Sequence, residues 1–184
     1  MKLVNSLCIG AGHAATGKGA SGAVGYLRES DEAREIRNKV FLLNNKKFPI
    51  YDCTVDAGTQ SSVLVNAVKL ANKSKADVDI QIHFNAFKKQ AKDGRAKGVE
   101  ALVYSAGNTK ANAVANQLCK EISSKLDIPN RGVKVNKNLY FLKKTSAPAV
   151  ILEVCFCDDE DDFIAYTQGK GRNVVANAIM NLIK

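Results

Sequence analysis

The chain contains two histidines in 184 residues, and both stand where an apolar, strand-like segment runs out. His13 follows Leu3–Ile9 after a Gly-Ala-Gly turn, in which glycine lets the backbone approach a ligand closely. His83 lies near the end of the alternating segment Val78–Phe84. Ligands of open α/β sheets bind beyond the carboxyl ends of the strands, so we expect both imidazoles to point to one place. Because neutral imidazole is a common metal ligand, the pair is a candidate metal site.

A carboxylate, Glu153, interrupts the apolar run Ala149–Phe156. A buried carboxylate that stays charged and unpaired costs several kcal/mol, so it needs a partner or a function. One interpretation is a buried salt bridge to a lysine or arginine. The other is a general base beside a water activated by a metal, which requires a carboxylate within hydrogen-bond reach.

A catalytic zinc commonly has two histidines and one carboxylate as protein ligands, with the fourth position left to water. The acids that could supply the carboxylate are Glu29, Asp31, Glu32, Asp56 and Asp79. Spacing alone does not choose among them, although Glu29 is attractive because it ends a glycine-rich segment and opens the first predicted helix. The residues therefore predict a zinc hydrolase with two histidine ligands and an unassigned third ligand.

The elements that must position these residues alternate between strand and helix patterns, which predicts an α/β fold in a single domain. The predicted strands are Leu3–Ile9, Pro49–Val55, Val78–Phe84, Gly98–Ser105 and Ala149–Phe156, with short strands expected in Arg131–Lys144. The predicted helices are Glu29–Asn44, Thr59–Ser74, Asn108–Leu126 and Asp161–Lys184, and the glycine-rich segment Gly10–Gly25 is predicted to be a loop. The nearly continuous apolar run of residues 149–156 is typical of a central strand covered on both faces.

Five motifs occur in order over almost the entire chain. They are Gly10–His13 (GAGH), Gly25–Ser30 (GYLRES), Ile80–Ala86 (IQIHFNA), Asn130–Lys134 (NRGVK) and Pro148–Phe156 (PAVILEVCF). At these residues the sequence closely resembles the type 3 N-acetylmuramoyl-L-alanine amidases, which are zinc enzymes of bacterial autolysins and phage endolysins. Each motif alone is a weak signal, whereas five in the family's order are a strong one.

The resemblance implies that His13, Glu29 and His83 bind one zinc ion and that Glu153 acts on the water in the fourth position. It implies a twisted mixed, largely parallel sheet of about six strands, flanked by helices on both faces. The reaction implied is hydrolysis of the amide that joins the lactyl group of N-acetylmuramic acid to the L-alanine of the stem peptide. The expected partner is therefore bacterial peptidoglycan.

Two further residues in the motifs, Asn85 and Arg131, are expected to contact the substrate, although Arg131 could equally have a structural role. Residues 1–184 are predicted to form one catalytic domain without a wall-binding module inside it. The N-terminus lacks the features of a signal peptide, which favours an endolysin that stays in the host cytoplasm until lysis. Five cysteines without a CxxC pair are typical of reduced thiols in that compartment.

The composition limits the classes of partner. No apolar stretch approaches the length that crosses a bilayer, so we expect no membrane insertion. The net charge of +9 favours anionic partners, and we expect attraction to the anionic polymers of the wall. The chain has no arginine-rich stripe and no RNA-binding aromatic signature, which argues against nucleic-acid recognition.

Three other functions compete with the zinc amidase. A cysteine hydrolase could use Cys155 with His83, because on a regular strand Cys155 would face the same side as Glu153. A zinc carboxypeptidase would use a similar set of ligands on a different bond. A non-catalytic, basic module that binds wall or nucleic acid would not need Glu153 at all.

Overall fold

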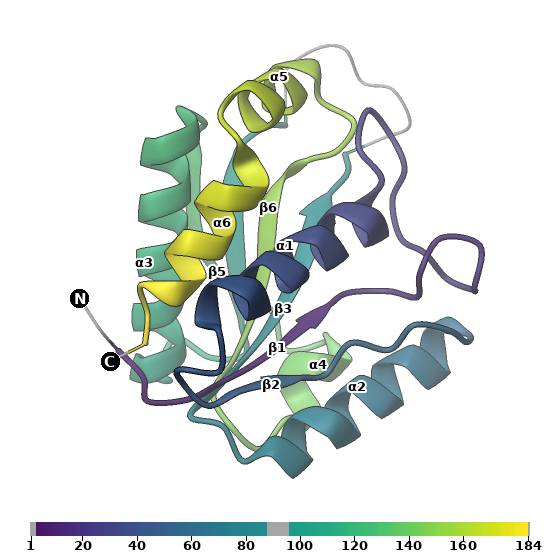
Figure 1. Cartoon of the computed structure of the whole chain (residues 1–184), viewed down its shortest axis with the longest axis vertical. Coiled ribbons are helices and arrows are strands. Elements are labelled where there is room, and N and C mark those ends of the chain that lie inside the picture. Colours follow the sequence, from purple (N-terminus) through teal and green to yellow (C-terminus); the bar gives the residue numbers. More distant parts are fainter. Residues whose placement is uncertain (1–2, 88–95, 184) are drawn as a thin grey trace.

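The computed structural model describes residues 3–87 and 96–183, which form one α/β domain (Figure 1). Six strands in this part of the chain form one sheet: β1 (Leu7–Ala11), β2 (Ile50–Asp52), β3 (Val78–Asn85), β4 (Val99–Val103), β5 (Asn130–Val135) and β6 (Ala149–Phe156). The helices of the same residues are α1 (Glu29–Asn44), α2 (Gln60–Ser74), α3 (Thr109–Leu126), α4 (Tyr140–Lys144), α5 (Glu160–Gln168) and α6 (Gly171–Met180). The predicted fold class is confirmed.

The strands follow one another in the sheet in the order β2-β1-β3-β6-β4-β5. Strands β2, β1, β3 and β6 are parallel, whereas β4 pairs antiparallel with β6 and parallel with β5. The sheet is therefore mixed and largely parallel, as expected. Strand β6 lies inside it, and every residue of that strand is buried except the half-buried Glu153.

Helices cover both faces of the sheet (Figure 1). The larger core lies between the sheet and α1, α3 and α6, and it contains Ile80, Ile82, Leu118, Leu152 and Ile179. A smaller core on the opposite face joins α2 and α4 to the sheet. The motif residues of β3 and β6 alternate between these faces, so their polar side chains lie on the side of α2 and α4.

The first strand begins later than its apolar pattern predicts. It covers Leu7–Ala11, and Val4 instead forms an isolated bridge to Ile183 near the C-terminal end. The cause is local: the Asn5 backbone N–H donates to the Asp77 carboxylate, and the Asp77 N–H donates to the Ser6 hydroxyl. These bonds hold the backbone in an irregular segment before the ladder starts.

Two other element predictions need correction. The segment Arg131–Lys144 contains part of β5, but its second half is the short helix α4 rather than another strand. The C-terminal helical region is divided in two, because Lys170 adopts a left-handed conformation with φ of 55° after α5. At Gly171, which opens α6, a Cβ would lie 2.1 Å from the Tyr166 ring, so only glycine allows this close approach.

No helix formed by residues 3–87 and 96–183 is both long and apolar enough to span a membrane.

Candidate metal centre

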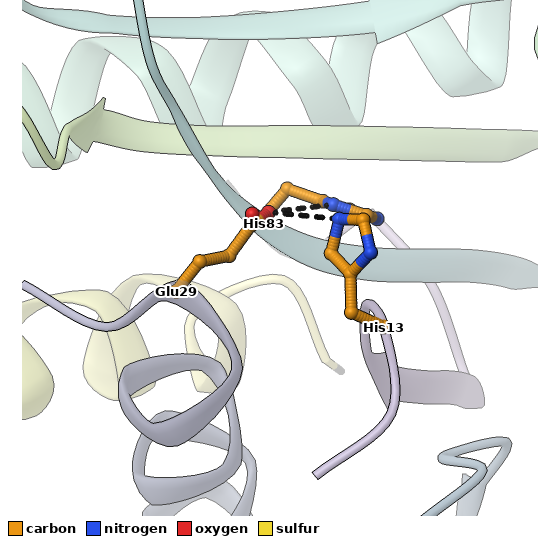
Figure 2. Close-up of side chains that lie close together, drawn as sticks. All are labelled: His13, Glu29 and His83. Atoms are coloured by element: carbon orange, nitrogen blue, oxygen red, sulfur yellow. Dashed lines mark hydrogen bonds and ion pairs between the residues drawn. The ribbon is translucent and has the colours of Figure 1, made fainter. Parts of the chain in front are cut away.

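Three predicted ligands from distant parts of the chain meet at one point (Figure 2). Glu29 Oε1 lies 2.9 Å from His83 Nδ1 and 3.3 Å from His13 Nε2. The two imidazole rings stand nearly perpendicular, with centroids 4.9 Å apart. Within the described residues, this is the one group of three or more potential metal ligands whose ligand atoms all lie within 4.8 Å of one another.

Each ligand occupies a position that its element fixes. His13 follows β1 in a left-handed conformation with φ of 60°, and its carbonyl accepts a hydrogen bond from Arg34 Nη2. Glu29 is the first residue of α1, and His83 lies in β3. The Gly12 N–H donates to the Ile82 carbonyl, which ties the His13 loop to the strand that carries His83.

Two glycines leave the space that the ligands occupy. A Cβ at Gly12 would lie 2.2 Å from His83 Cε1, and a Cβ at Gly22 would lie 2.3 Å from Glu29 Oε2. Real Cβ atoms do not approach other atoms so closely, so any larger residue would displace a ligand side chain. The glycine-rich loop thus has a direct steric function at the centre.

The Glu29 carboxylate is held by the backbone as well as by the histidines. Its Oε1 accepts from the Phe84 N–H, and its Oε2 accepts from the Ala23 N–H. Burial alone would raise its pKa, but the hydrogen bonds and positive charge of His13 and His83 hold the pKa well below the usual range. The carboxylate is therefore ionised, which is the form that binds a cation.

The donor set and its spacing suit zinc. In a tetrahedral site with bonds of about 2.0–2.1 Å, ligand atoms lie about 3.3 Å apart. The two distances from Glu29 Oε1, 2.9 and 3.3 Å, are close to this spacing. Two nitrogens and one carboxylate oxygen also form the ligand set of many zinc hydrolases.

A neighbour of the centre, Gln81, was not predicted from the sequence. Its Oε1 lies 3.3 Å from His83 Nε2, the ring nitrogen that points away from Glu29. In the neutral imidazole that donates Nε2–H to Gln81, the lone pair of Nδ1 would be available to a metal in place of the contact with Glu29. Such outer partners orient metal-binding histidines, and the position of Gln81 two residues before His83 on the same face of β3 could have indicated this role.

Glu153 lies opposite His83 on one side and opposite Glu100 on the other, in register with both. Burial raises the pKa of Glu153 to about 7; the charge of His83 lowers it, whereas Glu29 and Glu100 raise it further. Its Oε2 is buried without a hydrogen-bond partner among the described residues. The salt-bridge interpretation is not seen there, and the carboxylate has the basicity of a general base at neutral pH.

The predicted substrate residues, Asn85 and Arg131, are joined by a carboxylate that the sequence did not single out. Glu100 Oε1 accepts from Asn85 Nδ2 at 3.0 Å, and Glu100 Oε2 accepts from Arg131 Nε at 2.6 Å. Lys134 Nζ also donates to Glu100 Oε2. These side chains lie beside Glu153 on the same face of the sheet.

Of the other acids that could have been the third ligand, three bind other partners and the fourth lies away from the cluster. Asp31 accepts from Thr16 Oγ1, Glu32 pairs with Arg172, and Asp56 pairs with Arg34. Asp79 is buried deeper along β3, in register with Cys8 and Ala149. Glu29 alone among the five lies against both histidines.

The geometry also corrects the expected direction of Cys155. A bulge in β6, where His83 and Asn85 face Glu153 and Phe156, adds one residue to that strand. Cys155 consequently packs in the larger core together with Val154, on the opposite face from Glu153. Burial raises the pKa of its thiol well above the usual value, which disfavours the nucleophilic thiolate.

Comparisons with known proteins identify the family and the fold of this chain. The family model described as N-acetylmuramoyl-L-alanine amidase matches residues 7–184. An uncharacterized protein of Clostridium perfringens is 32% identical over 165 residues, which are 89% of this chain and 48% of that protein. The endolysin of Bacillus phage SPP1 is 29% identical over 160 residues, which are 83% of this chain and 55% of that protein.

The fold is shared with a solved enzyme domain. The catalytic domain of the CD27L endolysin, which targets Clostridia Difficile, superposes with a TM-score of 0.79 at 22% identity, and the match covers 97% of this chain and 98% of that domain. The chain spans between 34% and 55% of the length of the curated relatives that it matches. From the extent of the family match, this chain belongs to the N-acetylmuramoyl-L-alanine amidase family.

Proposed function

We propose that the chain hydrolyses the amide between the lactyl group of N-acetylmuramic acid and the L-alanine of the peptidoglycan stem peptide, using one zinc ion. The observation that carries this proposal is the convergence of His13, Glu29 and His83 beside the buried carboxylate of Glu153. Membership of the amidase family supports the choice of bond.

In this proposal His13, Glu29 and His83 hold the metal, and Gln81 keeps the His83 ring in the orientation that binding needs. Bound zinc would supply Lewis acidity, which makes water more acidic and polarises a carbonyl group. Glu153 takes the proton from the attacking water and passes it to the amine of L-alanine as the amide bond breaks. Its raised pKa matches both halves of that task, since it must accept and release a proton near neutral pH.

Arg131 and Asn85 are proposed to lie along the bound substrate on the same face as Glu153. Asn85 Nδ2 donates to Glu100, and its Oδ1 accepts from the Ala86 N–H. Asn85 is therefore proposed to act in part by orienting the Glu100 carboxylate. Among the described residues, Arg131 donates through Nε to Glu100 and through Nη1 to the Lys97 carbonyl, and its Nη2 has no acceptor there.

We further propose that the protein is an endolysin, which remains in the host cytoplasm until lysis and then cuts the bacterial wall. The relationship to the SPP1 endolysin supports this role. The charge of +9 would attract the chain to anionic wall polymers. Added salt should therefore slow the lysis of whole cells more than the cleavage of soluble muropeptides, because exposed charges are screened. Equal slowing would contradict the attraction.

Product analysis tests the proposed activity. Digestion of purified peptidoglycan should release stem peptides with a free L-alanine amine and leave glycan strands intact. Cleavage within the stem peptide would indicate a carboxypeptidase instead. Activity that resists a chelator but is lost with a thiol alkylator would indicate a cysteine hydrolase, and binding without cleavage would indicate a non-catalytic module.

A further inference from the structure

Arg131 and Lys134 share the buried carboxylate of Glu100, on the face of the sheet that carries Glu153. Glu100 is 7% exposed in its side chain, whereas Arg131 and Lys134 are 30% and 45% exposed. One negative charge thus faces two positive charges, which leaves a local excess of one positive charge. Asn85 fills the remaining oxygen of Glu100, so this carboxylate is fully engaged and holds the cations in place.

The guanidinium of Arg131 is fixed close to the strand that carries Glu153. Its carbon lies 4.9 Å from the centroid of the Phe156 ring, so the side chain reaches back from β5 across β4 to β6. Its Nε donates to Glu100, and its Nη1 has one long contact of 3.5 Å to the Lys97 carbonyl. In the described part of the chain Nη2 has no hydrogen-bond acceptor, so donors remain for a ligand.

The Phe156 ring under Arg131 belongs to a residue further along the sheet than Glu153. Glu153 faces His83, and Phe156 faces Asn85, two residues further along β3. Two strand residues span about 7 Å. An extended substrate covers the same distance in about two residues. A group bound beside Phe156 would therefore lie about two extended residues from the bond that is cut.

We propose that Arg131 and Lys134, held by Glu100, form a subsite that binds the α-carboxylate of the second stem-peptide residue. This inference rests on the proposed amidase function. In the uncut substrate the lactyl carboxyl group is consumed in the amide, so it is not the anion that this subsite would bind. A guanidinium with free terminal nitrogens binds a carboxylate with paired, charge-assisted hydrogen bonds, and Lys134 adds a second charge.

The test compares two soluble muropeptides that differ only in the second stem residue, which carries either a free α-carboxylate or a carboxamide. The wild type should prefer the carboxylate in kcat/KM by about tenfold, the effect of one charge-assisted hydrogen bond. Arg131→Gln should remove most of this preference, because it should lower kcat/KM much more for the carboxylate than for the carboxamide. Lys134→Gln should reduce the preference in part and serves if Arg131→Gln is unstable.

Lys120→Gln, an exposed site on α3 that covers the opposite face of the sheet, removes the same charge and should change neither rate. Equal cleavage of both substrates by the wild type would overturn the subsite alone. An equal loss on both substrates in Arg131→Gln would show a structural role and would also overturn it. Absence of cleavage of either substrate would overturn the proposed function, and the subsite with it.

Discussion

Glu153 and His83 face each other across the parallel pair of β6 and β3, so their side chains lie on the same face of the sheet. His83 contacts Glu29, whereas Glu153 does not belong to the group of three ligands. In the proposed mechanism this arrangement separates binding of the metal from transfer of the proton.

Replacement of Glu153 tests this separation. Glu153→Gln should lower kcat by about 10²–10⁴-fold, the usual contribution of a general base, because an amide cannot accept the proton. Its zinc content should equal that of the wild type, measured by elemental analysis. Glu160→Gln, at an exposed position in α5, is the matched control and should keep full turnover. Loss of zinc together with turnover would show that Glu153 is a ligand instead.

The space that Gly12 and Gly22 leave for the predicted ligands can be tested at Gly12. Gly12→Ala should weaken zinc binding, because the added methyl group would occupy the space of the His83 ring. The affinity can be measured by competition with a chromogenic chelator. Gly107→Ala is a suitable control, since the only atom near a Cβ there is Ser105 Oγ at 3.6 Å. Equal zinc affinity in both variants would show that the ligands have more room than the structure indicates.

The outer partner of His83 makes a separate prediction. Gln81→Leu keeps the approximate volume but removes the acceptor for His83 Nε2–H, so zinc affinity should fall about 10–100-fold. The same chelator competition gives the affinity, and Gln168→Leu at an exposed position of α5 is the control. Unchanged affinity in Gln81→Leu would mean that the ring is oriented by Glu29 and packing alone.

Asp79 predicts a pH dependence of stability. Burial raises its pKa from 3.8 to about 7, and neither carboxylate oxygen has a hydrogen-bond partner among the described residues. Because the folded-state pKa is the higher one, the folded protein keeps a proton that the unfolded chain releases within this window. Stability attributable to Asp79 is thus lost as the pH rises from 3.8 to about 7, by up to about 4 kcal/mol.

Asp79→Asn removes this titration. The free energy of unfolding of Asp79→Asn, measured with urea, should increase relative to that of the wild type as the pH rises from 5 to 8. A constant difference between the two proteins over this range would show that Asp79 is ionised in the folded state. A buried amide also costs stability in Asp79→Asn, but by the same amount at every pH. Comparing how the two free energies of unfolding change with pH therefore removes this constant cost.

The sequence placed the three predicted ligands where the structure brings their side chains together, because strand ends and the first turn of a helix are local features. His13, Glu29 and His83 could be assigned once the motifs were considered in order. Glu100 could not be assigned to the site from the sequence. It lies beside Glu153 only because β4 enters the sheet antiparallel to β6. Such non-local pairing leaves no signal in the periodicity of one segment.

The alternation of apolar and polar residues did not predict the bulge in β6 either. A regular strand would place Cys155 beside Glu153, and one extra residue reverses this relationship. The break between α5 and α6 depends on the left-handed Lys170 between Gly169 and Gly171, which the apolar pattern of residues 161–184 does not reveal. In both cases a single backbone irregularity decided the outcome.

The central claim is that His13, Glu29 and His83 hold one zinc ion on which amide cleavage depends. The most direct measurement is a zinc titration of metal-stripped protein, followed by the rate of release of L-alanine amines from peptidoglycan. The rate should rise from near zero to a plateau at one zinc per chain, and His83→Ala should stay near zero at the same zinc concentration. Full activity of the stripped protein, or an unchanged titration of His83→Ala, would contradict the claim.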